Sequence, residues 1–462
     1  MKTLIVSILA AVVVLSADVV AQKQLPPEGG KPKDFKLPEK QQFKLPNGME
    51  VTLIPFGSVP KVTVSVVVRS GNINEKENQV WLADITGEMM KEGTTTKTSI
   101  QVAQDAAGMG GNVDISVGPD LTTLSGDVLA EFGPQFVKLL ADVARNPLLP
   151  ESELARIKND RIRELSVSKS QPQSLALEEF RHLMYPHHAY GRVFPTQAML
   201  EQYTIDDVRS FYRNNFGAQR TSVFVAGVFD AKTMEAAVRD AFGDWEKGPA
   251  VFVDIPKPVA KQQFGLIERP GAPQSTIYFG IPVLNPADKD YVKMVVTNSL
   301  LGGSFASRIT SNIREKKGYT YSPFSQVSSR YRDAYWAEIA DVGTDVTGAA
   351  LKEIIGEIKR LQQEPPSKEE LEGIQNYLGG TFVLQNSSRR GIIGQLSFLH
   401  LHELPETYLS SYVKNVYAVT PADVQMMTQK YLRDQDMTLV IVGDKKKVED
   451  QIREYATPKP EK

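Results

Sequence analysis

Residues 204–230, "TIDDVRSFYRNNFGAQRTSVFVAGVFD", decide the fold because the chain carries a second copy of this stretch. The second copy is residues 420–446, "TPADVQMMTQKYLRDQDMTLVIVGDKK", in which Gly443 matches Gly227 at an offset of 443 − 227 = 216. Each copy predicts a helix followed by a strand that is rich in β-branched residues. A long repeat at a constant offset indicates two units with the same structure.

A second repeated segment supports the duplication. Residues 150–160 read "PESELARIKND" and residues 366–376 read "PSKEELEGIQN". Leu154 matches Leu371 at an offset of 371 − 154 = 217, which agrees with the first repeat. The order of the two repeats is therefore the same in each half, and each half is expected to contain a complete domain.

The predicted architecture is α+β, with two tandem homologous domains that each pack an antiparallel-rich sheet against helices. We place the first domain at 43–247 and the second at 264–458. Between them, residues 248–263 contain several prolines and no helical period, which is typical of a linker.

The composition is that of an ordinary globular protein. The chain has 462 residues, 41% of them hydrophobic, and a formal net charge of −2. A nucleic-acid-binding surface would require an excess of Lys and Arg, so we expect no nucleic-acid partner. The absence of cysteine excludes disulfides and leaves packing as the source of stability.

The N-terminal residues predict export. Lys2 precedes the apolar run "TLIVSILAAVVVLS", and the small residues Val19 and Ala21 form a cleavage site before Gln22. We therefore assign residues 1–21 to a signal peptide and 22–42 to an extended arm rich in Pro and Lys. A bacterial periplasm suits such a chain, and no stable membrane span is expected after cleavage; an uncleaved anchor is the alternative.

A helix in the first domain resembles a catalytic helix in which the metal-binding and catalytic residues are replaced. Residues 82–94 read "LADITGEMMKEGT". Together with the repeats, this stretch makes the chain resemble the inverzincin metallopeptidases, the family of pitrilysin, insulinase and mitochondrial processing peptidase. In that family a helical H-x-x-E-H motif binds zinc through its two histidines, while the glutamate is the general base for the zinc-bound water. The resemblance covers most of the chain, from about Phe43 to Tyr455.

Aligned with that motif, the first histidine becomes Asp84, the glutamate becomes Gly87 and the second histidine becomes Glu88. A downstream acidic ligand is retained as Glu164, which lies 164 − 88 = 76 residues after Glu88. One retained ligand cannot hold zinc, and Gly87 cannot accept a proton. The resemblance therefore implies no catalytic residue and no bound metal in this chain, with zinc carried by a partner subunit.

A different metal is the alternative interpretation of these positions. Asp84, Glu88 and Glu164 could form a carboxylate cluster for magnesium, calcium or manganese, which prefer oxygen ligands. On an exposed helix, however, acidic residues usually face solvent. The histidines offer no further ligands, because they lie outside the aligned site and are expected to have packing or surface roles: His182, His187, His188, His400 and His402.

The second domain retains a substrate-binding motif. Residues 300–325, "LLGGSFASRITSNIREKKGYTYSPFS", resemble the family stretch in which an Arg and a Tyr contact the peptide backbone opposite the zinc. Those two residues correspond to Arg314 and Tyr321. An Arg fork grips a carbonyl or carboxylate with two donors, and a Tyr hydroxyl can stabilise an oxyanion. The plainer alternative is that Arg314 pairs with Glu315 on the surface and Tyr321 packs as a half-buried aromatic residue.

Residues 106–128 resemble the family's edge strand, which pairs with extended substrate. Asp114 and Ile115 depart from the usual Asn-Ala, and Pro119 interrupts the strand pattern. A plain edge strand protected by Pro and acidic residues is an equal alternative.

Three functions follow from these observations. The favoured one is the non-catalytic, substrate-binding subunit of a heterodimeric zinc endopeptidase that acts on peptides or unfolded segments, with an H-x-x-E-H-bearing homologous partner. The second is a structural or peptide-binding protein without a peptidase partner. The third is a metal-dependent hydrolase that uses Asp84, Glu88 and Glu164.

Overall fold

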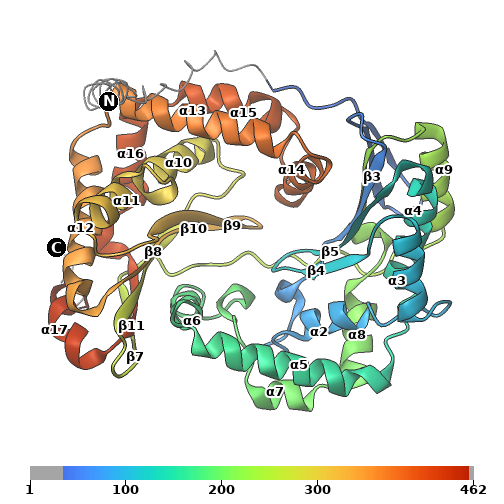
Figure 1. The fold of residues 1–462 in the computed structure, drawn as a ribbon, viewed down its shortest axis with the longest axis horizontal. Coiled ribbons are helices and arrows are strands. Elements are labelled where there is room, and N and C mark those ends of the chain that lie inside the picture. Colours follow the sequence, from blue (N-terminus) through green and yellow to red (C-terminus); the bar gives the residue numbers. More distant parts are fainter. Residues whose placement is uncertain (1–34, 457–462) are drawn as a thin grey trace, which may run out of the picture. The chain divides into compact units, whose positions relative to one another are not determined.

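The computed structural model describes residues 35–456, in which each half of the chain builds one β-sheet with helices around it (Figure 1). The predicted signal peptide and most of the predicted arm lie outside the described residues. At the end of the arm, Phe35 packs edge-on against Phe382, with ring centroids 5.0 Å apart. The last residues of the predicted arm therefore contact the second half of the chain.

The first half holds a six-stranded sheet in the order β1-β2-β6-β3-β5-β4. Only β2 and β6 run parallel; the other neighbours are antiparallel. Its strands are β1 (Gln41–Lys44), β2 (Glu50–Pro55), β3 (Lys61–Val68), β4 (Asp114–Val117), β5 (Thr122–Leu129) and β6 (Thr221–Gly227). Its α-helices are α2 (Leu82–Met89), α3 (Ser99–Gly108), α4 (Gly133–Arg145), α5 (Glu151–Ser170), α6 (Pro172–Met184), α7 (Gln197–Gln202), α8 (Ile205–Asn215) and α9 (Ala231–Phe242).

The second half holds a five-stranded sheet in the order β7-β11-β8-β10-β9. Its strands are β7 (Gln263–Glu268), β8 (Gln274–Val283), β9 (Phe324–Arg330), β10 (Asp333–Gly343) and β11 (Thr438–Gly443). Its α-helices are α10 (Tyr291–Asn298), α11 (Arg308–Thr310), α12 (Thr347–Gln363), α13 (Lys368–Gln385), α14 (Arg389–His402), α15 (Thr407–Ala418), α16 (Pro421–Tyr431) and α17 (Lys445–Ala456). Two π-helical turns, η5 (Ser299–Gly303) and η6 (Ser311–Lys316), flank α11.

The duplication predicted from the sequence is confirmed strand by strand. The order β7-β11-β8-β10-β9 repeats β2-β6-β3-β5-β4, and in both sheets the first of these pairs is parallel. The matched segments also begin alike, because Thr204 and Thr420 each cap a helix and exchange hydrogen bonds with an aspartate three residues later. Such reciprocal caps satisfy the free N–H groups at a helix start. The α+β, antiparallel-rich fold class is therefore correct.

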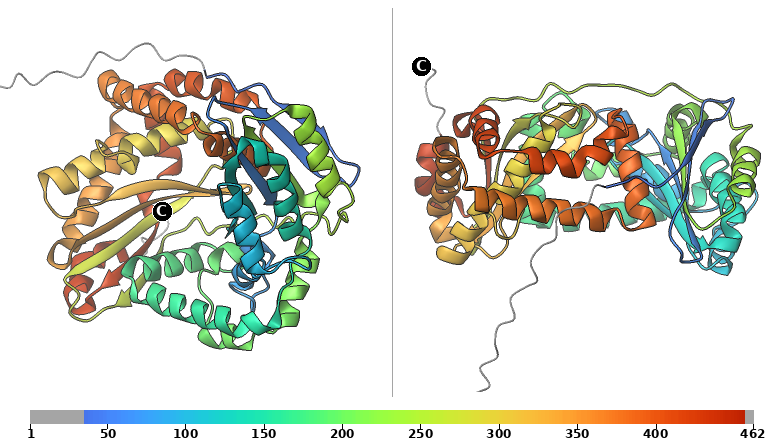
Figure 2. Two further views of the ribbon diagram at one scale, coloured as in Figure 1. Left: turned by 45° about the vertical axis from the view of Figure 1, so that its right-hand side comes forward. Right: turned by 90° about the horizontal axis from the view of Figure 1, so that it is seen from above.

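Each sheet is covered on one face by a helix from the other half of the chain. The helix α14 of the second half packs on β3 and β6, and α6 of the first half packs on β8 and β11 (Figures 1 and 2). Apolar clusters lie beneath both helices. Because each half buries a sheet face of the other, the two halves form one compact unit.

A buried polar contact strengthens this exchange. Tyr185, just after α6, donates a hydrogen bond of 2.5 Å to Asp333 at the start of β10. Burial raises the pKa of Asp333 to about 6.

Between Phe242 and Gln263 the described chain contains neither helix nor strand, and Figure 2 shows it as an extended connection. No helix within residues 35–456 is both long and apolar enough to cross a membrane.

Candidate functional site

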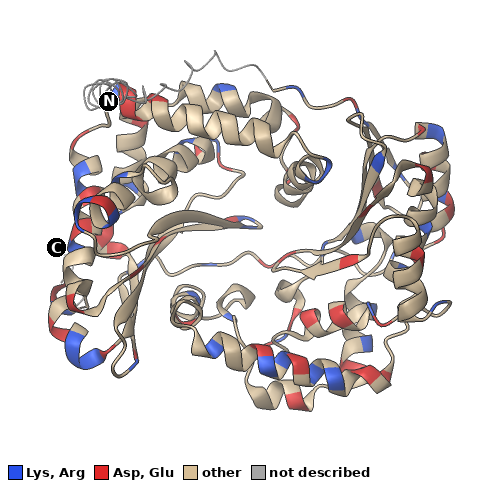
Figure 3. Ribbon diagram, viewed as in Figure 1, with Lys and Arg blue, Asp and Glu red and all other residues tan. Residues whose placement is uncertain are grey.

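The degenerate metal positions meet around an arginine. Asp84 and Glu88 lie on α2, and Glu164 lies on α5, the helix along which acidic and basic residues alternate in Figure 3. Arg161, also on α5, places one guanidinium nitrogen 2.6 Å from Glu164 and another 3.1 Å from Glu88. The three carboxylates are thus brought together as the alignment implied, but a fixed guanidinium cation lies among them.

This donor set does not fit zinc. It contains no imidazole, and Arg161 already neutralises two of its carboxylates at hydrogen-bond distance. Lys91 adds a second cation 2.9 Å from Glu88. Among the described residues, no group of three or more His, Cys, Asp and Glu side chains is placed to hold a metal ion. No step of a hydrolytic reaction is therefore assigned to this helix.

The position of the family's general base is closed by packing. A Cβ atom added to Gly87 would lie 2.7 Å from the Val117 side chain on β4. That distance is shorter than real Cβ contacts, so a side chain at residue 87 would require Val117 to shift. Restoring a glutamate here would push against β4, the edge strand of the first sheet.

A buried carboxyl that the alignment did not single out lies beside Asp84. Glu75 is 5% exposed and accepts hydrogen bonds from the Ala83 N–H (2.9 Å) and the Asn72 amide (3.1 Å). The same amide donates to Asp84 at 2.8 Å. Burial, with a contribution from the Asp84 charge, raises the pKa of Glu75 to about 8. Burial also raises the pKa of Asp84.

Replacing Glu75 with glutamine should stabilise the protein at alkaline pH. The folded-state pKa of about 8 lies above the ordinary value of 4.5, so between these values the native state holds a proton that the unfolded state has lost. Stability should therefore fall by about 1.4 kcal/mol per pH unit as the pH rises towards 8. Glu75→Gln keeps the acceptor oxygen and removes this dependence. Urea unfolding at pH 5 and pH 8 should show the variant more stable than the native protein only at pH 8.

The predicted Arg and Tyr come together in the second half. Arg314 lies on the π-helical turn η6, and its guanidinium carbon stacks 4.4 Å from the Phe305 ring centroid and 5.1 Å from that of Tyr321. The Arg314 Nε atom also lies 3.2 Å from Glu315, the contact expected of a surface ion pair. Tyr321 is 79% exposed and is not packed as a half-buried aromatic residue. Its hydroxyl is therefore free to meet a ligand.

These residues border a pocket of about 410 Å³. Three aromatic side chains that the sequence analysis did not single out also border it: Phe305 and Phe324 from the same segment, and Tyr377, which only the fold brings there. All three are large and exposed, which is unusual for a solvated surface and typical of binding sites. The floor needs glycine, since a Cβ atom on Gly302 would lie 2.5 Å from the buried Glu338 carboxyl.

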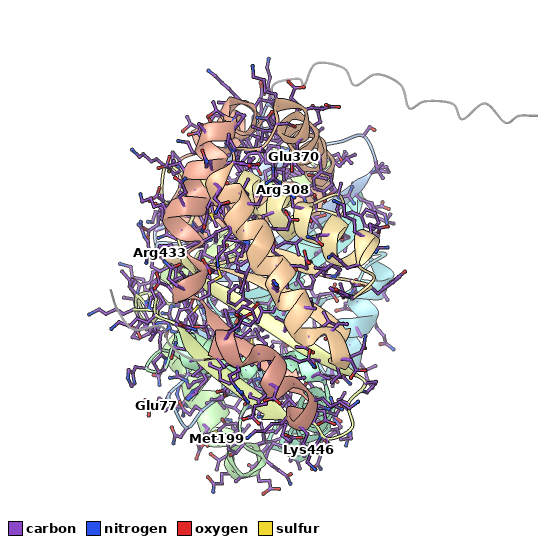
Figure 4. All side chains as sticks on the ribbon, turned by 90° about the vertical axis from the view of Figure 1, so that its left-hand side faces the viewer. Glu77, Met199, Arg308, Glu370, Arg433 and Lys446 are labelled. Atoms are coloured by element: carbon purple, nitrogen blue, oxygen red, sulfur yellow. The ribbon has the colours of Figure 1, made fainter. Side chains whose placement is uncertain are left out.

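The motif is anchored to the helices α12 and α13 by one ion pair and one hydrogen bond. Arg308 binds Glu370 of α13 with two parallel hydrogen bonds of 2.7 and 2.8 Å, and the two residues lie side by side in Figure 4. Asn312 donates to Glu357 of α12 at 2.8 Å. Arg308, part of the matched motif, thus holds the segment in place, while Arg314 is left facing the pocket. π-Helical turns such as η5 and η6 are frequent at functional sites.

The predicted edge strand is confirmed. β4 lies at the end of the first sheet and pairs with β5 alone. Asp114 begins it, exposed, and Ile115 turns into the core. The strand is only four residues long, which blunts edge pairing.

The histidines are placed largely as expected. His182 and His187 are exposed, and His188 and His402 are buried in packed surroundings. His400 differs, because it lines a second pocket between α14 and the first sheet.

Two duplicated sheets with helices packed around them define a two-domain α+β fold. Residues 54–194 match the family model for insulinase (peptidase family M16), and residues 202–378 match the model for the peptidase M16 inactive domain. The chain belongs to the M16 peptidase family.

This chain resembles relatives named as zinc proteases and relatives named as inactive or non-peptidase proteins. An uncharacterized zinc protease of Bacillus subtilis, YmxG, is 23% identical over 75% of this chain and 85% of its own length. A non-peptidase homolog of Helicobacter pylori is 21% identical over 88% and 94%. Two solved structures share the fold: a peptidase M16 inactive domain from Pseudomonas fluorescens (TM-score 0.82, 24% identical, 88% of this chain and 98% of that one) and a protease from Helicobacter pylori (0.84, 18%, 88% and 100%).

Proposed function

We propose that this chain is the non-catalytic, substrate-binding subunit of a heterodimeric zinc endopeptidase that acts on peptides or unfolded segments. Its partner is a homologous chain with an intact H-x-x-E-H helix. Both subunits are exported to the bacterial periplasm. Zinc is held by the partner and not by this chain.

One observation carries this proposal: the metal-helix positions of the first half cannot hold zinc, whereas the Arg314/Tyr321 pocket of the second half is open to a ligand. At the metal helix, Arg161 lies among the carboxylates and Gly87 is packed against Val117. In the second half, Arg314 and Tyr321 border an open aromatic pocket. An apolar pocket with a few convergent polar groups is the usual form of a binding site.

The pocket would act by orientation and charge. Arg314 would donate two hydrogen bonds to a peptide carbonyl or carboxylate, and the Tyr321 hydroxyl would stabilise the oxyanion that develops when a partner-activated water attacks. The aromatic walls would hold a large apolar side chain of the peptide. Holding the scissile bond in place can contribute several kcal/mol to lowering the barrier.

The relatives support a family in which active and inactive members coexist. Proteins named as zinc proteases and one named as a non-peptidase homolog both match most of this chain. A non-peptidase member would have a function if it completed the substrate-binding surface of an active zinc protease.

The test is reconstitution with an exported relative from the same genome that carries H-x-x-E-H. Each purified chain alone should fail to cleave an unfolded peptide library, and the mixture should cleave it. Zinc analysis of the separated chains should find the metal on the partner. A control mixture should contain the partner with its general-base glutamate changed to glutamine, which should assemble without cleaving.

Two results would contradict the proposal. If the partner cleaves equally fast without this chain, the chain contributes nothing to catalysis. If this chain binds peptides tightly but forms no complex with the relative, it is a peptide-binding family member without peptidase activity.

A further inference from the structure

A serine, a histidine and a glutamate meet in the pocket between α14 and the first sheet. Ser222 on β6 and Glu50 on β2 are paired in the strand register, so their side chains lie on one face of the sheet. His400 on α14 contacts both. Its Nε2 atom lies 3.0 Å from the Ser222 hydroxyl, and its Nδ1 atom lies 3.3 Å from the Glu50 carboxylate.

We propose that Ser222, His400 and Glu50 form an esterase centre, with Ser222 as nucleophile, His400 as general base and Glu50 as the group that orients the imidazole. The arrangement places a nucleophile within hydrogen-bond distance of a base, and places that base 3.3 Å from a carboxylate that can orient it. This activity is independent of the peptide-binding function proposed above.

The surroundings fit a small carboxylic ester. The pocket has a volume of about 350 Å³. Besides the three proposed catalytic residues, its lining consists of the polar residues Gln42, Thr52, Arg69, Glu403 and Glu406 and the apolar residues Phe224, Leu396, Leu399 and Leu404. The apolar residues would receive a short acyl chain, while Arg69, which lies 3.8 Å from Glu403, would supply positive charge for the oxyanion.

The three groups all line the pocket but differ in exposure. The Glu50 side chain is 52% exposed and the His400 side chain 32% exposed, whereas Ser222 is 3% exposed and lines the pocket. Burial lowers the pKa of His400 below the ordinary value of 6.5, so the ring is neutral at pH 7 and can accept a proton.

The reaction balances in two steps. The Ser222 oxygen attacks the ester carbonyl carbon while its proton passes to His400; the carbon–oxygen bond to the alcohol breaks, and the alcohol leaves with that proton. A water molecule then gives a proton to His400 and attacks the acyl-serine. Ser222 leaves with that proton, and the net reaction converts ester and water to acid and alcohol.

The test uses the purified chain, p-nitrophenyl acetate and butyrate, and a fluorophosphonate probe. We expect the native chain to hydrolyse the esters in the presence of 1,10-phenanthroline, which would remove any zinc enzyme from consideration. Mass spectrometry should locate one probe adduct on Ser222. Ser222→Ala should lower hydrolysis by at least ~100-fold and abolish labelling, and Glu50→Gln should lower hydrolysis without abolishing labelling.

The matched control is Ser65→Ala. Ser65 is also 3% exposed, on the adjacent strand β3, and does not line the pocket. This variant should hydrolyse and label like the native chain, and thermal melts should show that all variants are folded. The proposal is overturned if the native chain hydrolyses neither ester, or if folded Ser222→Ala retains hydrolysis or labelling.

Discussion

Replacing Arg314 with alanine should lower kcat/KM of the reconstituted peptidase by roughly 100-fold, or about 2.7 kcal/mol of transition-state stabilisation. The guanidinium is the only cation among the residues that border the described aromatic pocket, and it stacks on Phe305 and Tyr321. Its removal would delete a two-donor contact to the peptide and release both rings. Steady-state kinetics with one unfolded peptide would measure the loss.

The matched control is Arg433→Ala. Arg433 is a half-exposed arginine of the second half, and it pairs with Asp436 at 2.8 Å as Arg314 pairs with Glu315. It lies outside the pocket, so its variant should leave kcat/KM unchanged.

Tyr321→Phe keeps the stacked ring and removes the hydroxyl, which should lower kcat more than it raises KM. Native kinetics in both Arg314→Ala and Tyr321→Phe would refute the binding role of this pocket.

Replacing Arg161 with methionine should destabilise the chain by about 2 kcal/mol at pH 7. This lies between the values for exposed and buried ion pairs, because Arg161 is 16% exposed while Glu88 and Glu164 are 37% and 51% exposed. Asp84 would lose the nearby positive charge that lowers its pKa. Its pKa would rise further, so the deficit should be present at pH 7 and shrink as the pH falls and Asp84 is protonated.

Arg163→Met provides the comparison on the same helix. Arg163 is 70% exposed and pairs with Asp160, so its loss should cost less than ~0.5 kcal/mol. Urea unfolding of both variants at pH 7 and pH 4.5 would measure the difference.

The presence of Arg161 among the carboxylates also predicts that magnesium, calcium or manganese does not raise the melting temperature of the native chain. A saturable rise would instead indicate that the carboxylates bind a metal despite Arg161.

Much of the fold could be predicted because duplication leaves a readable trace. The offset of 216 or 217 residues, the matched helix caps at Thr204 and Thr420, and the strand endings at Gly227 and Gly443 are local features, and each recurs in the structure. The exchange of α6 and α14 between the sheets could not be predicted. Their apolar residues indicate that a face is buried, but not which sheet covers it.

Part of the candidate site could likewise be predicted from the sequence, and part could not. Asp84, Gly87 and Glu88 were found because they occupy a motif of constant spacing, and Arg314 and Tyr321 because their whole segment is retained. Glu75 and Tyr377 were missed, since neither stands in a motif. His400 was assigned a packing or surface role, whereas the structure places it in a pocket beside Ser222, which is 178 residues away in sequence.

The amino-acid sequence by itself determined the duplication and the residues present at the aligned motif positions, namely Asp84, Gly87 and Glu88 in the first half and Arg314 and Tyr321 in the second, because each motif lies within a short stretch of the chain. Only the tertiary structure decided that Arg161 lies among the old ligand positions, that aromatic rings surround Arg314, and that Ser222, His400 and Glu50 meet. Those arrangements depend on strand register and on helix packing between distant segments, and such long-range contacts leave no local pattern to read.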